Sequence, residues 1–242
     1  MSCFYRHILK PILFRISPDI AHEIFIVIGG IAGRFILMRW VFKRLYDYRG
    51  PDISKTVDDI TYRTPVLLAA GFDTDGRLTR ILPSLSFGGE EIGSITAYPC
   101  AGNQRPQLTR LARNKSIVVF KGLKNHGVDA LIKTLQQTSR IKDFVLGISV
   151  ARTNEQATTA DVEAGIHDYV ESFKKLVSAN IGDYYTINIS CPNAFTGETF
   201  AEPALLARLL PCLREIPCTK PVYLKMPINM PWEIFAQLLD IA

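Results

Sequence analysis

Five short apolar runs, each followed by a stretch of helical periodicity, constrain the fold of this chain more than any other sequence feature. The runs lie at 66–70, 91–96, 145–150, 184–189 and 222–226. The helix-like stretches lie at 75–84, 127–139, 161–179, 202–215 and 231–242. Buried strands that alternate with amphipathic helices are typical of parallel βα units. The sequence therefore predicts an α/β fold.

No G-x-G-x-x-G motif follows the first run, so a (β/α)8 TIM barrel is favoured over a Rossmann fold. A complete barrel takes about 250 residues, and about 60 of the 242 residues here precede the first run. Only about the first five βα units are expected, with the chain truncated at its C-terminal side. The inner face of such an open sheet is expected to expose Val, Ile and Leu.

The first 44 residues predict a helical extension before this domain. One helix is expected over 3–16, and a second is expected to begin with Ser17 as N-cap and Pro18 in the first turn. The apolar stretch 24–33 is about half the length that a membrane span needs. Arg34 and then Arg39 interrupt the apolar residues that follow. A polar connector over 45–64 is expected to join this extension, 1–44, to the barrel domain, 65–242.

Charge distinguishes the extension from the rest of the chain. The net charge of the protein is +5, and residues 1–50 account for it with eight basic and three acidic side chains. Apolar helices with basic residues are typical of segments that lie on an anionic membrane surface. A helical hairpin packed on its own domain is an equally good interpretation of these residues alone. Nucleic acid is not expected as a partner, because the basic residues are interleaved with Ile, Leu and Phe.

The cysteines and the N-terminal residues indicate in which kind of cellular compartment the protein is expected. The five cysteines form no C-x-x-C pair, so neither a disulfide framework nor a metal site is expected, and a reducing compartment fits. The N-terminus is not a secretory signal, since its long apolar run comes too late.

A run of polar residues follows the fourth predicted strand and is the most specific local motif. It reads Asn188-Ile189-Ser190-Cys191-Pro192-Asn193. Two amides offer donors and acceptors to a planar ligand with imide and carboxylate edges, and a thiol between them could move a proton. A buried cysteine in an ordinary turn is the alternative, and from this run alone it is the better one.

Further motifs, in a fixed order, favour the functional interpretation. They are Leu68-Ala69-Ala70-Gly71-Phe72-Asp73-Thr74-Asp75-Gly76, Glu91-Ile92-Gly93-Ser94-Ile95-Thr96, the segment 102–111, Gly122, Asn125, Gly127-Val128-Asp129 and Lys225 in Leu-Lys-Met. Together with the Asn-Ile-Ser-Cys-Pro-Asn run, this pattern resembles the dihydroorotate dehydrogenase family over essentially all of residues 4–242. The resemblance implies an oxidoreductase of pyrimidine biosynthesis that oxidises dihydroorotate to orotate with FMN.

The resemblance also implies roles for individual residues. Cys191 takes the position of the base that removes the C5 proton, and a thiol, with an ordinary pKa of about 8.5, can do this near neutrality when activated. The positions expected to bind the substrate are Asn188, Asn193, Thr74 and Asn125. Those expected to contact FMN are Ala70, Gly71, Ser94, Ser149, Asn188 and Lys225.

The N-terminal residues resemble the membrane-bound, quinone-using class of the family. The segments Leu13-Phe14-Arg15 and Ser17-Pro18-Asp19-Ile20-Ala21-His22-Glu23 carry this likeness. It implies a membrane quinone as electron acceptor, a tunnel for it that includes His22 and Arg110, and a peripheral location on a membrane. The cytoplasmic face of a bacterial inner membrane is the expected location.

Several positions depart from the family pattern. Thr74 replaces a lysine that contacts substrate and flavin, Val119 replaces a substrate asparagine, and Cys191 stands where the quinone class usually has serine. The phosphate-binding loops after strands seven and eight of the family lie beyond Ala242. Two alternatives therefore stay open: an FMN-binding barrel that acts on a different small ring, and a truncated, inactive relative.

Overall fold

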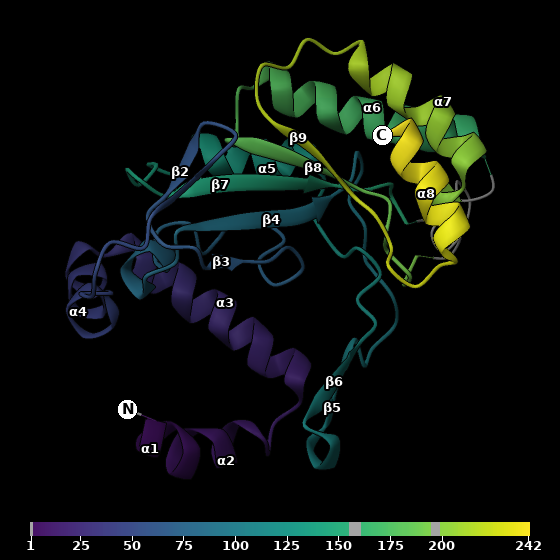
Figure 1. Cartoon of the computed structure of the whole chain (residues 1–242). Helices are drawn as coiled ribbons and strands as arrows, with labels where there is room; N and C mark the ends of the chain where they lie inside the picture. Colours follow the sequence, from purple (N-terminus) through teal and green to yellow (C-terminus); the bar gives the residue numbers. More distant parts are fainter. Residues whose placement is uncertain (1, 155–160, 195–198) are drawn as a thin grey trace.

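A five-stranded parallel sheet forms the centre of the computed structural model, which describes residues 2–154, 161–194 and 199–242 (Figure 1). The strands lie in the order β3-β4-β7-β8-β9, which is also their order along the chain. Their bounds are β3 Leu67–Leu68, β4 Gly89–Ile95, β7 Val145–Val150, β8 Tyr184–Asn188 and β9 Val222–Lys225. Parallel neighbours in sequential order are the arrangement of a (β/α)8 barrel. The five predicted strands are thus confirmed, with β3 and β9 at the two edges of the described sheet.

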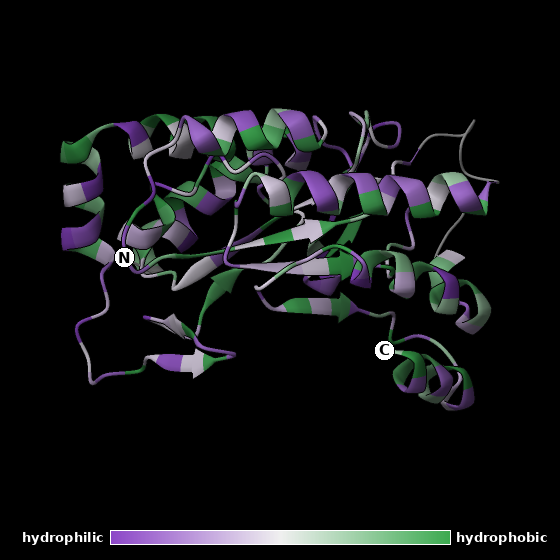
Figure 2. Ribbon diagram, turned by 90° about the horizontal axis from the view of Figure 1, so that it is seen from above, coloured by the Kyte–Doolittle hydropathy of each residue, from purple (hydrophilic) through white to green (hydrophobic). Residues whose placement is uncertain are grey.

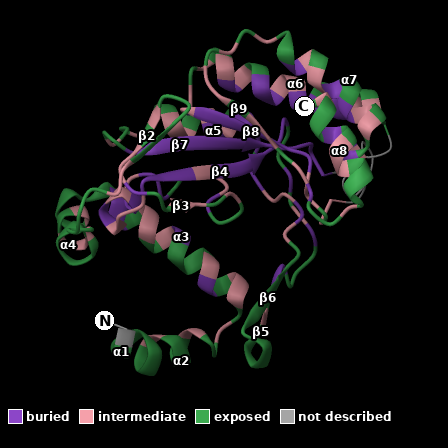
Figure 3. Cartoon of the chain, viewed as in Figure 1, coloured by how far each residue is buried: buried purple, intermediate pink, exposed green. Residues whose placement is uncertain are grey.

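Four helices lie along one face of the sheet (Figure 1): three return the chain from one strand to the next, and the fourth follows β9. They are α5 Val128–Gln136, α6 Val162–Ser178, α7 Pro203–Arg214 and α8 Trp232–Ile241. Fully buried residues such as Leu131, Phe173 and Leu206 project from the helices to meet Ile148 and Ile187 of the strands. Figure 3 shows the resulting core as a continuous buried region around β4, β7 and β8.

The opposite, inner face of the sheet carries polar side chains. The expectation that it exposes a layer of Val, Ile and Leu is therefore wrong. Glu91 on β4 accepts hydrogen bonds from Tyr184 (3.3 Å) and Thr186 (3.1 Å) on β8. The isoleucines Ile92, Ile148 and Ile187 face the helices instead, because each strand alternates its side chains between two faces. A polar inner layer is therefore built into the sheet.

The helix expected over 75–84 is also wrong. Gly76 there adopts a left-handed conformation, and only a 3-10 helix, η2 Leu82–Leu85, forms. Pro83 lacks the amide hydrogen that an α-helix would use. The side chain of Asp73 instead accepts the backbone amides of Asp75 (3.2 Å) and Leu78 (2.5 Å), which stabilises a turn.

Helices occupy most of the N-terminal extension, as predicted. They are α1 Ser2–Phe4, a π-helical turn η1 Tyr5–Leu9, α2 Lys10–Leu13, α3 Pro18–Arg34 and α4 Ile36–Tyr46. Pro18 is in the first turn of α3, but the Ser17 side chain makes no capping hydrogen bond. No single described helix is long and apolar enough to cross a membrane. Helices α3 and α4, which meet at an angle of 109°, reach that length and composition only as a pair.

One helix of the extension packs on the barrel domain, and the others expose apolar side chains. Helix α3 lies against the barrel domain: Ile26 and Ala32 are buried, and a side chain on Gly29 would approach Leu78 Cδ2 to 2.5 Å. The remaining helices expose large apolar side chains, which include Phe4, Ile8, Ile12, Ile36, Leu37 and Trp40. Figure 2 shows hydrophobic residues along these helices, and Figure 3 shows that α1, α2 and α4 are largely exposed.

Two antiparallel pairs of strands lie outside the main sheet and were not expected. Within the predicted connector, β1 Lys55–Val57 pairs with β2 Ile60–Tyr62. Between β4 and α5, β5 Leu108–Leu111 pairs with β6 Ser116–Val119. This second pair projects toward the N-terminal helices (Figure 1).

Candidate active site

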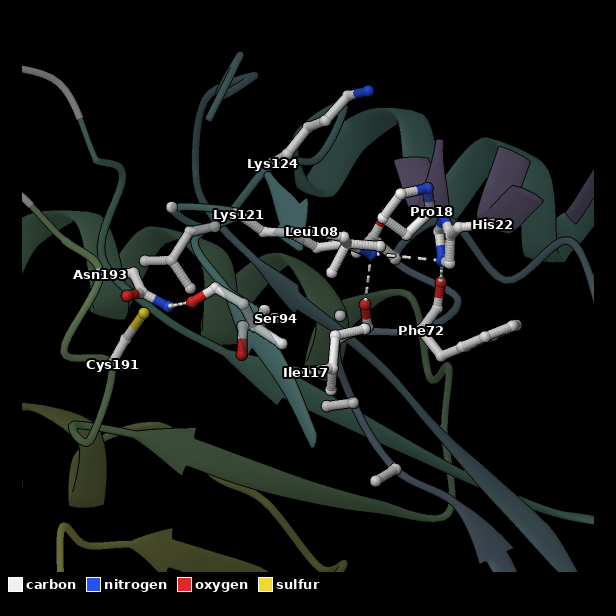
Figure 4. Close-up of a pocket in the computed structure, with 18 of the residues that line it drawn as sticks. Pro18, His22, Phe72, Ser94, Leu108, Ile117, Lys121, Lys124, Cys191 and Asn193 are labelled. Atoms are coloured by element: carbon white, nitrogen blue, oxygen red, sulfur yellow. Dashed lines mark hydrogen bonds between the residues drawn. The ribbon is translucent and has the colours of Figure 1, made fainter. Parts of the chain in front are cut away.

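A cavity of about 700 Å³ opens at the carboxyl ends of the parallel strands and extends to the N-terminal helices. Its inner end is formed by the loops after β3, β4 and β8 and by the last residue of β9. Its outer part is formed by α2, α3 and the β5–β6 pair (Figure 4). Loops at the carboxyl ends of barrel strands are where TIM-barrel proteins carry their sites. The predicted residues that line this cavity are Ala70, Gly71, Thr74, Ser94, Asn188, Cys191, Asn193, Lys225, His22 and Arg110.

Asn188, the last residue of β8, is held rigidly at the inner end. Its amide nitrogen donates to Ser94 Oγ (2.8 Å), and its amide oxygen accepts from the backbone nitrogen of Ser190 (3.0 Å). Ser94 Oγ lies 2.7 Å from Ser149 Oγ. Ser149 is fully buried and does not line the cavity, so the structure places it behind Ser94, as a support.

Cys191 lies on the loop after β8 and lines the cavity beside Asn193. The loop is tied to the segment between β4 and α5: Asn103 donates to the backbone oxygen of Asn193 (2.9 Å), and the Asn193 amide donates to the backbone oxygen of Val119 (3.1 Å). These contacts join residues 90 and 74 positions apart and hold the loop that carries Cys191. Figure 4 shows Cys191 and Asn193 together at one end of the cavity.

The loop after β3 presents its backbone to the cavity at Gly71. Gly71 donates its amide to the backbone oxygen of Gly93 (2.7 Å) and has a φ of +101°. A Cβ at Gly71 would meet no atom within 4 Å, so this glycine faces open space. A planar ring could therefore approach the backbone closely here. Lys225, which pairs in register with Asn188, brings an ammonium group to the neighbouring strand end.

Asn125, which was predicted to bind the substrate, does not line the cavity. It is buried. Its amide oxygen accepts from the Gly127 amide (2.7 Å), and its amide nitrogen donates to Leu123 O (2.8 Å) and Thr96 Oγ1 (2.8 Å). The structure thus gives Asn125 a place within the loop architecture, and its contact with a substrate stays a prediction.

Two of the predicted polar residues, Arg110 and His22, lie in the mostly apolar outer part of the cavity. Arg110 on β5 donates to the backbone oxygens of Leu13 (3.0 Å) and Ile16 (2.9 Å), and its guanidinium lies over the Phe14 ring at 4.9 Å. It therefore joins the β5–β6 pair to the end of α2, where a cation is favourable. His22 Nε2 on α3 lies 2.7 Å from the backbone oxygen of Phe72.

Lys121 is a site residue that sequence reasoning missed. Its Nζ donates to the backbone oxygen of Gly71 (2.8 Å) and lies 3.2 Å from His22 Nε2. Figure 4 shows Lys121 reaching across the cavity toward His22. Only the path of the β5–β6 pair shows where its side chain goes.

A buried carboxyl lies beneath the first loop. Glu90 on β4 is fully buried, and neither of its carboxyl oxygens has a hydrogen-bond partner among the residues that the structure describes. Burial, and then the nearby Asp73 carboxylate, raise the pKa of Glu90 well above its ordinary value of 4.5. Glu90 is therefore protonated at a pH where an exposed glutamate is ionised.

This shift predicts how stability depends on pH. The folded protein holds the Glu90 proton more tightly than the unfolded chain, so stability falls as pH rises above about 4.5. Glu90→Gln removes that loss, and we expect it to raise the thermal midpoint at pH 8 by about 3 °C or more. The advantage should shrink toward pH 4.5. Thermal unfolding followed by circular dichroism from pH 4.5 to 8 measures this, and a difference that does not widen with pH would contradict the assignment.

Fold and site together define a protein of the (β/α)8-barrel class with a strand-end cavity. A comparison with protein-family models identifies the family. The model described as dihydroorotate dehydrogenase matches residues 53–242. The chain therefore belongs to the dihydroorotate dehydrogenase family, which confirms the predicted resemblance.

Curated relatives agree with this assignment, and a solved structure agrees with the fold. The chain is 30% identical over 245 residues to a dihydroorotate dehydrogenase (quinone) of Thermosynechococcus vestitus, and 34% identical over 188 residues to one of a Mycobacterium species. The first match covers 98% of this chain but 65% of the relative, so the chain spans about two thirds of that protein's length. A crystal structure of DHODH from Eimeria tenella in complex with ferulenol superposes with a TM-score of 0.78 over 96% of this chain, at 21% identity.

Proposed function

We propose that this chain forms the greater part of an FMN-dependent dihydroorotate dehydrogenase that passes electrons to a membrane quinone. The observation that carries the proposal is the single cavity that joins a polar strand-end site to an apolar channel. Cys191, Asn188 and Lys225 lie at the polar end. Leu13, Phe14, Phe25 and other apolar residues line the channel toward the exposed helices.

The residues at the polar end fit FMN. The open backbone at Gly71 leaves room for a planar ring. Ser94 and Asn188 present polar atoms beside it, and the Lys225 ammonium would favour negative charge on the ring. The chemistry that FMN supplies when bound is acceptance of the hydride from C6 of dihydroorotate and its release as two electrons to a quinone.

The chain's own residues would then bind the substrate and move a proton. Asn188 and Asn193 are fixed by their neighbours and can direct amide groups to the ring of dihydroorotate. Cys191, between them, would remove the C5 proton. His22 and Arg110 would lie along the path of the quinone, whose apolar tail enters between α2, α3 and the β5–β6 pair. The exposed apolar and basic helices would rest on an anionic membrane surface.

Flavin absorbance tests this proposal in steps. We expect the purified protein to show an FMN absorbance band that dihydroorotate bleaches without oxygen and that a quinone then restores. A band that dihydroorotate leaves unchanged would overturn the proposed substrate.

Action on a different ring is the second candidate function. Thr74 and Val119 support it, because they take the places of a lysine and an asparagine that would contact orotate. A missing partner for a buried polar substrate group typically reduces binding by more than tenfold. Bleaching of the flavin by another cyclic amide, but not by dihydroorotate, would favour this candidate.

A further inference from the structure

A second, polar cavity shares a wall with the cavity described above. It has a volume of about 320 Å³ and lies between α3 and the loops after β3 and before α5. Residues that line both cavities are His22, Phe72, Thr74, Lys121 and Lys124. The pair formed by His22 and Lys121 is therefore in contact with the apolar channel on one side and with a polar space on the other.

The polar cavity contains acids and bases that can exchange protons with solvent. The acids that face it are Asp19 and Glu23 on α3 and Asp73 and Asp75 after β3. Its basic groups are Arg77, Arg105, Lys124 and His126. His126, which is largely exposed, lies 2.9 Å from the Asp75 carboxylate. A chain of polar groups thus leads from the surface to the shared wall.

We propose that Lys121 and His22 form a proton relay that carries protons from the polar cavity to a quinone in the apolar channel. The proposal rests on the proposed function for the identity of the acceptor. It does not follow from the position of His22 alone, because it requires Lys121, which enters the channel from the segment after β6.

The hydrogen-bond geometry favours movement of a proton between the two side chains. His22 Nε2 lies within hydrogen-bond distance of both Phe72 O (2.7 Å) and Lys121 Nζ (3.2 Å). With its proton on Nε2, the ring donates to Phe72 and cannot accept from Lys121. With its proton elsewhere, the ring accepts from Lys121 and loses the bond to Phe72. A ring with its proton on Nδ1 can therefore accept a proton from Lys121, and a ring protonated on both nitrogens can return one.

Electrostatics support the same conclusion. Burial, and then the charge of Lys121, lower the pKa of His22. Burial, and then the charge of Lys124, lower the pKa of Lys121. Both groups therefore release protons more readily than exposed side chains do, which a relay requires.

Reduction of a quinone requires a proton that the relay could supply. A quinone takes up two electrons and two protons to become a quinol. Bound FMN would supply the two electrons and one of these protons, so the protein would have to supply the other. Lys121 Nζ would donate that proton to the quinone oxygen and become a neutral amine. His22 would first take a proton on Nδ1 from the polar cavity, and would then pass its Nε2 proton to the neutral Lys121 amine, which leaves the ring neutral again.

Variants at Lys121 separate proton transfer from simple charge. The FMN-loaded protein is reduced with dithionite and mixed with a short-chain quinone, so the measured rate does not depend on the dihydroorotate reaction. We expect both Lys121→Met and Lys121→Arg to slow flavin reoxidation roughly 10²-fold, since arginine keeps the charge but does not release its proton. Lys133→Met, on the exposed side of α5, is the matched control and should reoxidise at the original rate. Reoxidation by Lys121→Arg at that rate would overturn the relay.

A second readout needs neither flavin nor quinone. In protein labelled with ¹⁵N-histidine, the His22 signals, assigned by their loss in His22→Asn, should titrate at higher pH in Lys121→Met, because the charge that lowers the pKa of His22 is gone. An unchanged His22 titration would overturn the pairing of the two side chains. Failure of the proposed function appears separately, as a flavin that dihydroorotate does not reduce.

Discussion

Replacement of Cys191 by alanine is expected to slow reduction of the bound flavin by dihydroorotate about 10²-fold or more, because the reaction then lacks a base at C5. The loop that carries Cys191 is held by Asn103 and by the backbone of Val119, so FMN should remain bound. Stopped-flow measurement of flavin bleaching gives the rate, and the flavin absorbance gives the occupancy.

Two further variants make this result specific. Cys212→Ala removes a thiol from α7, outside the cavity, and should leave the rate unchanged. Cys191→Ser keeps a proton acceptor of similar size and should retain part of the activity. A wild-type rate of bleaching in Cys191→Ala would show that another group accepts the proton.

Deletion of residues 1–16 is expected to reduce quinone-dependent reoxidation roughly 10²-fold while dihydroorotate still reduces the flavin. These residues supply Leu13 and Phe14 to the channel and the backbone oxygens that fix Arg110. Loss of a positioned binding surface commonly costs a factor of this size. Reoxidation by a short-chain quinone, compared with a water-soluble acceptor such as ferricyanide, measures the effect.

The same deletion should release the protein from anionic vesicles, because it removes exposed Phe4, Ile8 and Ile12 together with three basic side chains. Helix α3 must stay, since its removal would uncover buried Leu78 and Ile81 and disturb the fold itself. If the shortened protein still floated with vesicles, the membrane surface would have to lie elsewhere, with α4 as the next candidate.

Agreement between sequence and structure is best where burial alone shapes an element. Strand β7 is buried along its whole length and coincides with its predicted bounds, because a strand covered on both sides reads as a continuous apolar run. Agreement is poorest over 75–84, where an apolar pattern suggested a helix. There Gly76, Pro83 and the Asp73 side chain produce turns instead, and α3 covers the apolar residues.

Some residues of the candidate site could likewise be predicted from the sequence, and others could not. The motif from Asn188 to Asn193 places its residues beside the cavity because a strand end fixes them locally. Ser149 and Asn125 lie one layer away, since a sequence motif reports the neighbourhood of a ligand but not which side chain points at it.

By itself, the sequence determined the order of the βα units, the basic and apolar character of the extension, and the family. These properties are written in residue types at short spacing, where periodicity reports which face of an element is buried. Only the tertiary structure decided that α3 packs on the barrel and that Lys121 reaches His22, 99 residues away in the chain. Contacts of that kind depend on the directions in which the loops and the β5–β6 pair leave the sheet, and local residue patterns do not encode those directions.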